Sequence, residues 1–390
     1  MTETRAVVHI DMLWQNIAFI RSLIGNRNLL APVKADAYGH GAVEVADAAL
    51  AAGASHLGVA RIDEAVELRE NDIDAPILLF SIPDPGEIPA AVEYDVTCLV
   101  SDRAFADALA DRAERRGAYE RAGKGPKPVS VHVKIDTGMG RIGVAPEDAP
   151  ELARYVAGKK MLRLDGVCTH LAVSDSSAPD NIAYTETQIA RFTGAVNAIK
   201  DAGVNPGIVH AAASGGILHH PASCFNMARP GILLYGYAPG NEDAEKVPVH
   251  PVMDLLTKIS FLKKVHKGES VSYGRTWVAA RDTIVATLPA GYADGLPRVA
   301  SGKLWFVING KRYPQVGAIC MDQCMVDLGP DPDVRLWDDV VIFGGNRGVG
   351  RDSGQADAPL TAASIAEMAG TIPYEILCGI GKRVPRIYLP

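Results

Sequence analysis

Five chemically unusual side chains stand at or just after the ends of short apolar runs. Lys34 follows "LLAPV" within the stretch "APVKADAYGHGA", Arg141 follows "SVHVKI", and His170 ends "LDGVCTH". Ser214 follows "IVHAA", and Arg229 lies within "FNMARPGILL". If each run is a strand of one parallel barrel, these side chains gather at its carboxyl end, where the active sites of barrel enzymes lie.

The chemistry that suits these residue types is that of pyridoxal phosphate. A lysine amine forms a Schiff base with the aldehyde of this cofactor, and a partly desolvated position would lower the pKa of Lys34 so that the free amine can attack. The phosphate is expected after the seventh and eighth runs, where "AAASGG" and "ARPGI" offer a hydroxyl and exposed backbone N–H groups. Such a cofactor serves as an electron sink for a carbanion at an amino acid's Cα.

Each of these residues also has a purely structural interpretation. Taken alone, a lysine such as Lys34 at the end of a strand is more often solvated than bound to a cofactor, because lysine is seldom fully buried. His170 alone is more often a hydrogen-bonded core histidine, and Ser214 would serve equally well as a helix cap. Arg229 would hold a loop by hydrogen bonds to carbonyl groups. Their common place at one end of an inferred barrel favours the functional interpretation.

The elements that position these residues alternate between apolar runs and helical segments from residue 28 to about residue 237. The runs are "LLAPV", "HLGVA", "ILLFS", "VTCLV", "SVHVKI", "LDGVCTH", "IVHAA" and "FNMARPGILL". Continuous apolar runs suit strands that are buried on both faces, as in a parallel sheet, and the segments between them have helical periodicity. Eight such units predict an α/β fold, a (β/α)8 TIM barrel, with a doubly wound open sheet as the alternative.

The sequence pattern changes after about residue 242, where short β-rich runs are separated by Gly, Pro and Asn. Asn309-Gly310 in "VINGKR" predicts a hairpin, and "LTAASIAEMAGT" predicts a helix from Thr361. We therefore expect residues 1–242 to form the cofactor-binding barrel and residues 243–390 to form a mostly β C-terminal domain. The basic segment "RAGKGPKP" at residues 121–128 is expected to be a solvated loop.

Composition excludes several classes of partner. The apolar fraction of 48% and the charged fraction of 22% are those of an ordinary globular protein. A formal net charge of -7 argues against a nucleic-acid or anionic-membrane surface. The six cysteines lack CxxC spacing, and neither a signal peptide nor an apolar run of about 18 residues is present, so a cytoplasmic protein with reduced thiols is expected.

The segment "GMGRIG" offers a rival interpretation as a dinucleotide-binding fingerprint. Gly138, Gly140 and Gly143 match G-x-G-x-x-G after a strand, and Asp165 lies about 20 residues further on. In a true fingerprint the helix begins within the glycines, so that its N-terminus meets the pyrophosphate. Here Pro146 places the start of the next helix after the motif. The motif therefore stays a weak indication of NAD.

Metal and serine-hydrolase chemistry have less support. His219 and His220 are adjacent, so they cannot share one helix face, and no carboxylate stands at ligand spacing. No G-x-S-x-G elbow occurs.

A series of motifs resembles the signatures of bacterial alanine racemases. In order, they are "PVKADAYGHG", "VKIDTGMGRIGV", "THLAVSD", "FNMARPGILLYG", "VSYGRTW", "GYADGLPR", "GAICMDQCMVD" and "GTIPYEILCGIGKRVPR". The resemblance runs over nearly the whole chain. It implies a pyridoxal-phosphate barrel and a C-terminal β domain in a homodimer with active sites at the interface. It also implies interconversion of L- and D-alanine, which supplies D-alanine for peptidoglycan.

The resemblance assigns the two acid–base groups. Lys34 corresponds to the Schiff-base lysine and to the base on one face of Cα, and Tyr273, from the partner subunit, to the base on the opposite face. Racemisation removes a proton from one face and delivers it to the other, so two differently placed groups are needed. In the family His170 hydrogen-bonds this tyrosine and meets Arg229. Arg229 corresponds to the residue at the pyridine nitrogen, which a donor-only guanidinium should keep unprotonated.

Further site residues follow from the same resemblance. Arg141 matches a residue near the cofactor's phenolic oxygen and the substrate carboxylate, and Met321 matches a backbone N–H contact to that carboxylate. Lys134 matches a lysine that is often carbamylated in the family. Tyr38 stands one helical turn after Lys34, where it would meet the phosphate. The phosphate-binding set comprises Tyr38, Ser214, Gly231, Ile232 and Tyr374, with the glycine and the isoleucine acting through backbone N–H groups.

The substrate entrance is also implied. Tyr273 and Tyr374 correspond to its inner gate, and Tyr292, Asp175 and Arg298 lie further out. Two tyrosines over Cα leave room for little more than a methyl group, which fits alanine.

Two positions depart from the family pattern. Ala318 stands where many relatives have arginine, and Ala213 replaces a common asparagine. The first change makes the outer part of the entrance wider or less cationic, the second lies near the phosphate loop, and neither touches the acid–base pair.

Three other functions would use a related fold. The nearest is a serine or broad-specificity racemase of the same fold. A related decarboxylase would have no need of a second base such as Tyr273, and a non-catalytic pyridoxal-phosphate carrier would resemble the first domain only.

Overall fold

Eight parallel strands form the first sheet of the computed structural model, which describes residues 4–119, 127–240, 246–344 and 357–390. The strand order is β8-β7-β6-β5-β4-β3-β2-β9, and every pair is parallel. The strands are β2 (Asn28–Pro32), β3 (His56–Val59), β4 (Ile77–Leu79), β5 (Val96–Val100), β6 (Val129–Lys134), β7 (Leu162–Cys168), β8 (Ile208–His210) and β9 (Met227–Ala228). These strands coincide with the eight predicted runs.

Hydrogen bonds beyond the strand ends nearly close this sheet into a barrel. The backbone N–H of Asn226 donates to the carbonyl oxygen of Val209 (3.2 Å), and that of Arg229 donates to Ala212 (3.0 Å). One cluster of buried apolar side chains is drawn from five of these strands: Leu30, Leu78, Leu99, Cys168 and Met227. The (β/α)8 prediction is therefore confirmed, and the open doubly wound sheet is not what the chain forms.

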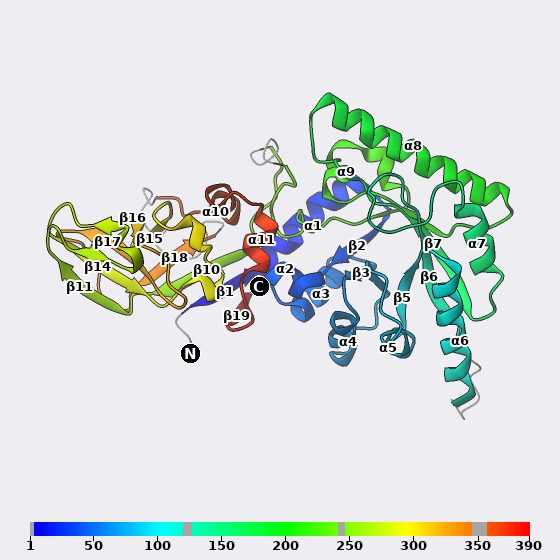
Figure 1. Cartoon of the computed structure of the whole chain (residues 1–390), viewed down its shortest axis with the longest axis horizontal. Coiled ribbons are helices and arrows are strands. Elements are labelled where there is room, and N and C mark those ends of the chain that lie inside the picture. The colour runs from blue at the N-terminus through cyan, green and yellow to red at the C-terminus, as the bar shows by residue number, and fades with distance from the viewer. Residues whose placement is uncertain (1–3, 120–126, 241–245, 345–356) are drawn as a thin grey trace.

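Helices surround the barrel, and each buries the face that its apolar periodicity predicts (Figure 1). In α8 (Pro179–Asp201), the buried apolar residues Phe192, Ala195 or Val196, and Ile199 recur three or four residues apart. The other helices are α1 (Ile10–Ile24), α3 (Ala42–Ala51), α4 (Ile62–Glu70), α5 (Ile88–Glu93), α6 (Arg103–Tyr119), α7 (Ala149–Ala157), α9 (Ser214–His219) and the 3-10 turn η1 (Pro221–Cys224).

The segment α2 (Lys34–Gly39), which follows the first barrel strand, is not an ordinary helical turn. Ala35, Asp36, Ala37 and Tyr38 have φ between 51° and 54° with positive ψ, so the chain winds in the left-handed sense. This conformation costs roughly 1–2 kcal/mol for each non-glycine residue. The predicted turn between Lys34 and Tyr38 therefore exists, but its hand is opposite to that of an α-helix.

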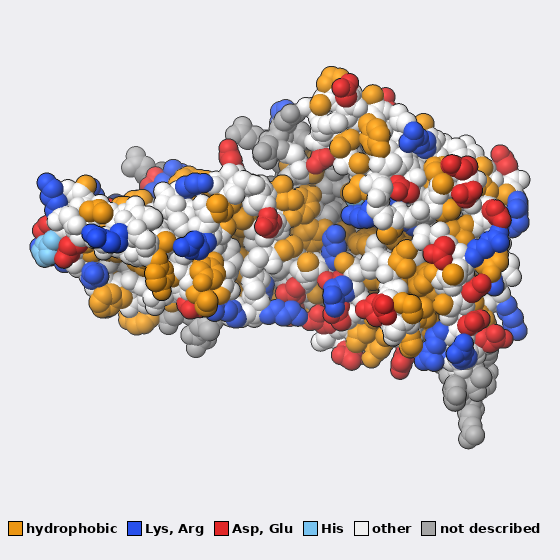
Figure 2. Space-filling model, in the orientation of Figure 1, with side chains coloured by type: hydrophobic (Ala, Val, Ile, Leu, Met, Phe, Trp, Pro, Cys, Tyr) orange, Lys and Arg blue, Asp and Glu red, His pale blue; other side chains and the backbone are white. Residues whose placement is uncertain are grey.

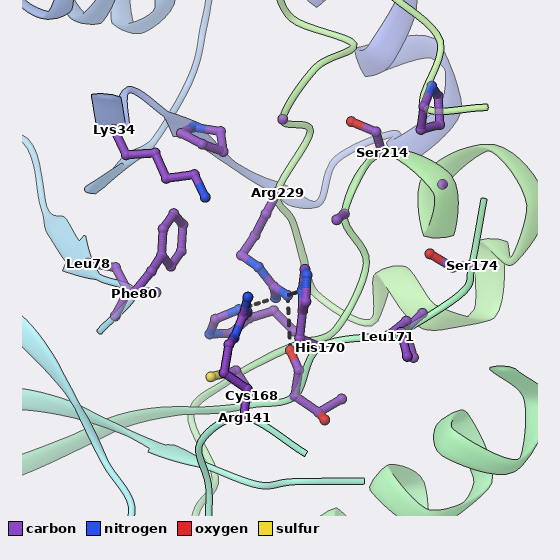
Figure 3. A pocket seen from close by; sticks show the side chains of 18 of the residues that line it. Lys34, Leu78, Phe80, Arg141, Cys168, His170, Leu171, Ser174, Ser214 and Arg229 are labelled. Carbon is purple, nitrogen blue, oxygen red and sulfur yellow. Dashed lines mark hydrogen bonds between the residues drawn. The ribbon is translucent and has the colours of Figure 1, made fainter. Parts of the chain in front are cut away.

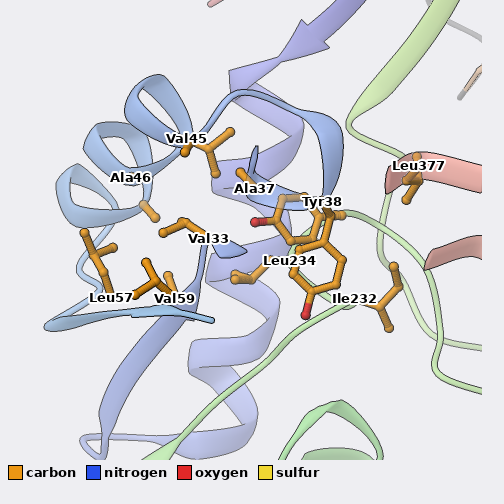
Figure 4. Close-up of a cluster of buried hydrophobic side chains, with 14 of the residues drawn as sticks. Val33, Ala37, Tyr38, Val45, Ala46, Leu57, Val59, Ile232, Leu234 and Leu377 are labelled. Carbon is orange, nitrogen blue, oxygen red and sulfur yellow. The ribbon is translucent and has the colours of Figure 1, made fainter. Parts of the chain in front are cut away.

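Surrounding groups hold this left-handed turn in place. His40, which is fully buried, has its Nδ1 2.9 Å from the carbonyl oxygen of Tyr38, and Arg386 donates to the carbonyl oxygen of Gly39. Figure 4 shows Tyr38 among Ile232, Leu234 and Leu377. The strain of the turn is thus offset by packing from the barrel and from the C-terminal segment.

The second sheet has nine strands in the order β11-β14-β17-β16-β15-β18-β10-β1-β19. Its members are β1 (Arg5–His9), β10 (Met253–Lys258), β11 (Phe261–Val265), β14 (Thr283–Leu288), β15 (Trp305–Ile308), β16 (Lys311–Val316), β17 (Cys324–Gly329), β18 (Asp339–Phe343) and β19 (Arg386–Leu389). A separate short ribbon joins β12 (Ser270–Val271) to β13 (Trp277–Val278). Residues after the barrel are thus mostly β, as expected.

Local signals in this domain are confirmed. Asn309 and Gly310 both have positive φ and connect β15 to β16, with Ile308 paired to Lys311. Helix α10 (Ala362–Ala369) begins after Thr361, whose side chain accepts the N–H of Ser364. A second helix, α11 (Pro373–Cys378), was not predicted and lies between the two domains (Figure 1).

The N-terminal strand links the two domains. β1 pairs with β10 and β19 of the second sheet, although we assigned residues 1–242 to the barrel domain. The proposed boundary at residues 242 and 243, like most of the basic segment at 121–128, lies outside the described residues.

Within the described ranges, no helix has the length and apolar character needed to cross a bilayer. On the face shown in Figure 2, acidic and basic side chains are interspersed over both domains.

Candidate active site

A cavity of about 270 Å³ opens at the carboxyl end of the barrel. It is lined by polar side chains from strands far apart in the sequence, together with apolar residues such as Leu78 and Phe80 (Figure 3). Eight of the nine predicted cofactor-binding residues line it: Lys34, Tyr38, Arg141, His170, Ser214, Arg229, Gly231 and Tyr374. The ninth, Ile232, is fully buried next to Gly231.

Lys34 is half-buried and directs its amine into this cavity (Figure 3). Its Nζ lies 5.9 Å from the ring centre of Tyr38 and 6.0 Å from that of Phe80. Burial lowers the pKa of Lys34, and the positive charge of Arg141 lowers it further. More of the amine is therefore unprotonated and nucleophilic at neutral pH than for a solvated lysine.

Arg229 is buried, and its guanidinium is anchored on one side. Nη2 donates to the carbonyl oxygens of Thr169 (2.9 Å) and Ala211 (2.8 Å), and Nη1 donates to Nδ1 of His210 (2.6 Å). Nε makes no hydrogen bond to any described residue, yet it is not enclosed. Arg229 therefore keeps an N–H free for an acceptor in the cavity.

His170 lies beside Arg229 on the same wall. Nη2 of Arg229 is 3.4 Å from Nδ1 of His170, the longest of its contacts. Burial lowers the pKa of His170 to about 3, and the neighbouring positive charges of Arg229 and Arg141 act in the same direction. The imidazole is thus neutral throughout the physiological pH range.

The cavity contains an anion cradle, formed by Gly231 and Ile232 together with the hydroxyl groups of Tyr38 and Ser214. The backbone N–H groups of Gly231 and Ile232 make no hydrogen bond within the described part of the chain. A Cβ at Gly231 would come within 3.0 Å of the Tyr38 hydroxyl and 3.9 Å of the Ser214 hydroxyl, so only glycine leaves this space open. Two free N–H groups and two hydroxyls suit a phosphate.

These features fit pyridoxal phosphate. The cavity combines the amine of Lys34, whose pKa is lowered, the donor-only guanidinium of Arg229, and the cradle around Gly231. Tyr374 completes the cradle wall, with its ring centre 5.9 Å from that of Tyr38.

The glycine motif does not form a dinucleotide site. The backbone N–H groups of Gly138 and Gly140 donate to the carboxylate of Asp136 at 3.0–3.1 Å, so an internal anion occupies the groups that a pyrophosphate would need. Helix α7 begins at Ala149, after the motif, as predicted. The loop instead carries Arg141 to the edge of the cavity (Figure 3).

Tyr273 and Met321 lie apart from the barrel cavity. Both line a second cavity on the C-terminal domain, and their exposed fractions are 71% and 53%. Within one chain, the structure thus separates Lys34 from the residue predicted to act on the opposite face of Cα.

The remaining predicted residues have clear positions. Asp175 lines the barrel cavity, whereas Tyr292 and Arg298 are exposed on the C-terminal domain. Lys134 is buried at the cavity wall, where its amine donates to the carbonyl oxygen of Ile135 (3.0 Å).

The two departures from the family pattern lie at different places. Ala213 lines the barrel cavity next to Ser214. Ala318 is buried, and its carbonyl oxygen accepts the hydroxyl of Ser272 (2.6 Å).

Sequence reasoning missed the buried residues behind the site. Gln188 of α8 accepts the N–H of Ala172 (2.9 Å) and donates to His170 O (3.2 Å) and Thr137 Oγ1 (3.3 Å), so it ties two strand-end loops together. His132 and His210 lie behind Arg229. A polar residue at an inward-facing helix position was the available signal for Gln188.

Two family models match most of the chain. The model of the alanine racemase N-terminal domain matches residues 8–239, and that of the C-terminal domain matches residues 252–388.

Individual relatives agree along the full length. The alanine racemase of Treponema denticola is 48% identical over 390 residues, covering 100% of this chain and 99% of that protein. The alanine racemase of Treponema pallidum is 46% identical, with both chains fully covered. Among solved structures, the alanine racemase of Streptomyces lavendulae has a TM-score of 0.88 at 34% identity, covering 100% of this chain and 98% of that chain. The biosynthetic enzyme of Pseudomonas aeruginosa has a TM-score of 0.83 at 30% identity, with both chains fully covered.

Proposed function

This chain belongs to the alanine racemase family of isomerases, and from that premise we propose that it interconverts L- and D-alanine with two acid–base groups, Lys34 and the Tyr273 of a second copy. The observation that carries the proposal is the common cavity of Lys34, the free N–H of Arg229 and the anion cradle at Gly231. One cofactor with an aldehyde, a ring nitrogen and a phosphate would engage all three.

Pyridoxal phosphate, when bound, supplies the electron sink that stabilises negative charge at the substrate's Cα. Lys34 would bind it covalently, Arg229 would donate to its ring nitrogen, and Tyr38, Ser214, Tyr374 and the N–H groups of Gly231 and Ile232 would hold its phosphate. Arg141 would bind near its phenolic oxygen and the substrate carboxylate.

The amine of Lys34 exchanges a proton with one face of Cα, because burial keeps part of it in the free-base form. The phenol of Tyr273 exchanges a proton with the other face. Nδ1 of neutral His170 faces the donor-only Arg229, so its proton resides on Nε2. Nε2 would donate a hydrogen bond to the phenol oxygen and so lower the cost of deprotonating the phenol. Because Arg229 is a permanent donor, it would keep the ring nitrogen of the cofactor unprotonated. The electron sink is then weaker, which favours simple proton exchange at Cα over transamination.

A homodimer with shared sites is part of the proposal. Tyr273 and Met321 are exposed in their own chain and line a separate cavity. Residues that act in catalysis should instead be enclosed in a site that excludes water. Association of two copies would cover the second cavity of one chain with the barrel mouth of the other. Tyr292, Asp175 and Arg298 would then border the substrate entrance. In this arrangement residues 1–242, together with Tyr374, supply the cofactor site, and the domain of residues 243–390 also contributes Tyr273 and Met321 to the partner's site.

The biological role that follows is supply of D-alanine for peptidoglycan in the cytoplasm. The alternative substrate range is serine or a broader set of amino acids, and turnover measured on alanine, serine and lysine distinguishes them. Carbamylation of Lys134 is a further proposal: burial lowers the pKa of this amine, which favours reaction with carbon dioxide, and the resulting anion would hold Arg141. Carbon-13 NMR of protein equilibrated with labelled bicarbonate tests it.

Absorbance and activity test the assignment together. Purified protein should be yellow and racemise alanine, and Lys34→Ala should lose both the visible band and the activity. A colourless wild-type protein that binds NADH would overturn the proposal.

A mixed dimer tests the sharing of sites. Lys34→Ala and Tyr273→Phe chains, each inactive as a homodimer, should regain activity when paired, because one of the two sites then has both residues intact. No recovery in a dimer shown to contain both chains would contradict shared sites.

A further inference from the structure

Arg383 connects two loops of the C-terminal domain through a single guanidinium. Nε and Nη2 donate to the two carboxylate oxygens of Asp294 at 2.8 and 2.9 Å, and Nη1 lies 2.8 Å from the carboxylate of Asp322. Asp294 is buried, and its Oδ2 also accepts the N–H of Gly291 (2.8 Å). A bidentate arginine–carboxylate pair fixes the relative orientation of the two side chains and also pairs their charges. Loop 291–294 and Asp322 are therefore held in one arrangement.

Backbone hydrogen bonds carry this arrangement to Met321. The N–H of Tyr292 donates to the carbonyl oxygen of Cys320, and the N–H of Ala293 donates to that of Met321, both at 3.0 Å. In a planar trans peptide the C=O and the N–H point in opposite directions. Because the Cys320 carbonyl faces loop 291–294, the N–H of Met321 faces away from it. Among the described residues this N–H has no hydrogen-bond partner.

We propose that Arg383 is a positioning residue, which fixes the direction of the Met321 N–H so that it can bind the substrate carboxylate in the partner's active site. The inference rests on the proposed function, since that function assigns Met321 to the carboxylate and to the partner's site. Met321 borders the second cavity together with Tyr273 and Asp322. Removal of the guanidinium would leave the buried carboxylate of Asp294 without its counter-charge and would release the carboxylate of Asp322. The peptide that precedes Met321 would then be held in place neither through loop 291–294 nor through Asp322.

A competing route runs through the chain's own barrel. Arg383 follows α11, and α11 carries Tyr374 into the barrel cavity of the same chain. If Arg383 acted through Tyr374, its loss would weaken the cofactor site in its own chain. The two routes predict different results when subunits are mixed.

The first measurement is steady-state kinetics of Arg383→Ala with L- and D-alanine. We expect KM to rise about tenfold for both enantiomers, the effect of losing one hydrogen bond to a charged group, with the visible cofactor band unchanged. Arg383→Lys keeps the charge but not the fork, so its KM should lie between those of the wild type and Arg383→Ala. Arg281→Ala, which removes an exposed arginine from the largely buried Asp327 (3.6 Å) in the same domain, is the matched control and should leave KM unchanged. A wild-type KM for Arg383→Ala would overturn the proposal.

The second measurement pairs Arg383→Ala with Lys34→Ala in one dimer, purified by two different tags. If Arg383 acts on the partner's site, one site contains both lesions and the other contains neither, so this dimer should show wild-type KM. A raised KM in the mixed dimer would place the effect in the chain's own barrel and overturn the proposal.

The same experiment separates failure of this inference from failure of the proposed function. Lys34→Ala paired with Tyr273→Phe is run in parallel. If that pair regains no activity, sharing of sites is wrong and the inference falls with it. If that pair recovers while the Arg383→Ala pair keeps a raised KM, only the role of Arg383 is wrong. Should Arg383→Ala yield no folded protein, Arg383→Lys takes its place in the mixed dimer.

Discussion

Nη1 of Arg229 donates to Nδ1 of His210 over 2.6 Å, and this contact determines the tautomers of two buried histidines. An arginine only donates, so Nδ1 of His210 accepts and its proton resides on Nε2. That Nε2 lies 2.8 Å from Nδ1 of His132, which is therefore the acceptor of the next bond. Burial lowers the pKa of both rings, and that of His132 to about 3. Two neutral imidazoles thus orient the guanidinium without adding charge.

The buried histidines predict a loss of stability in mild acid. Burial lowers the pKa of His132 and His170 to about 3 and that of His40 to about 4, below the unfolded value of about 6.5. Below pH 6.5 the unfolded chain takes up protons that the folded chain excludes. The free energy of unfolding should therefore fall as the pH drops from 6.5 towards 4, by about 1.4 kcal/mol per pH unit for each histidine.

Denaturant titrations at several pH values and one fixed protein concentration measure this slope. His132→Asn is the informative variant, because its amide oxygen can accept from His210 where Nδ1 did, while the titrating ring is gone. In this variant the free energy of unfolding should depend on pH less steeply, by the contribution of one histidine proton. An unchanged slope would contradict a neutral, buried His132.

The free N–H of Arg229 predicts the selectivity of the reaction. Arg229→Glu would replace a donor by a carboxylate that stabilises a proton on the ring nitrogen and makes the cofactor a stronger electron sink. Racemisation should slow and the ratio of transamination to racemisation should rise, measured as keto acid formed per racemisation event. Arg163→Gln, which removes an exposed arginine paired with the partly buried Asp165, is the control. Equal product ratios in Arg229→Glu and the wild type would contradict this role.

Short-range signals explain why much of the fold could be predicted from the sequence. The eight barrel strands follow from continuous apolar runs, and the β15–β16 hairpin follows from Asn309-Gly310, whose residues accept positive φ. The barrel-end residues could be grouped because carboxyl ends of parallel strands meet at one edge. The sequence pattern therefore predicts that Lys34, Ser214 and Arg229 share one cavity, and all three line it.

Features imposed by distant parts of the chain could not be predicted in this way. Nothing in "ADAY" favours a left-handed turn, and its conformation depends on Arg386, which is 347 residues from Gly39. The pairing of β1 with β10 depends on residues about 250 positions away. Gln188 and His132 looked like ordinary helix and strand residues because their roles exist only through tertiary hydrogen bonds.

Gly39 is predicted to be required for the left-handed turn and hence for cofactor binding. It has φ of +80°, and an added Cβ would lie 2.2 Å from the carbonyl oxygen of Leu377 in α11. Gly39→Ala should destabilise the protein and weaken cofactor retention. Gly203→Ala is the matched control, because Gly203 has φ of +77° and no atom within 4 Å of the added Cβ. Thermal unfolding should show an excess cost of about 2 kcal/mol or more for Gly39→Ala; equal costs would mean that α11 does not restrain the turn.

The charge of Arg141 is predicted to control capture of the cofactor by Lys34. Burial is the largest cause of the lowered pKa of Lys34, and Arg141 is the next. Arg141→Gln removes the second cause, so the pKa of Lys34 should rise and less free amine should be present at a given pH. The rate at which apoprotein regains its visible band should then reach half its maximum at a higher pH than in the wild type. An unshifted or lower midpoint would contradict electrostatic control by Arg141.

Tyr273→Phe should separate the two faces of Cα. Loss of the phenol removes one acid–base group while Lys34 keeps its own, so racemisation should fall by roughly 100-fold or more, the scale of one general acid–base group. In deuterated water, Lys34 should still exchange the Cα proton of a single enantiomer, whereas the wild type labels both. The matched control is Tyr292→Phe, which removes another exposed hydroxyl of the same domain and should still label both enantiomers. Nuclear magnetic resonance of separately incubated L- and D-alanine measures the labelling. Equal residual exchange of both enantiomers by Tyr273→Phe would mean that one group reaches both faces, and the two-base assignment would then be wrong.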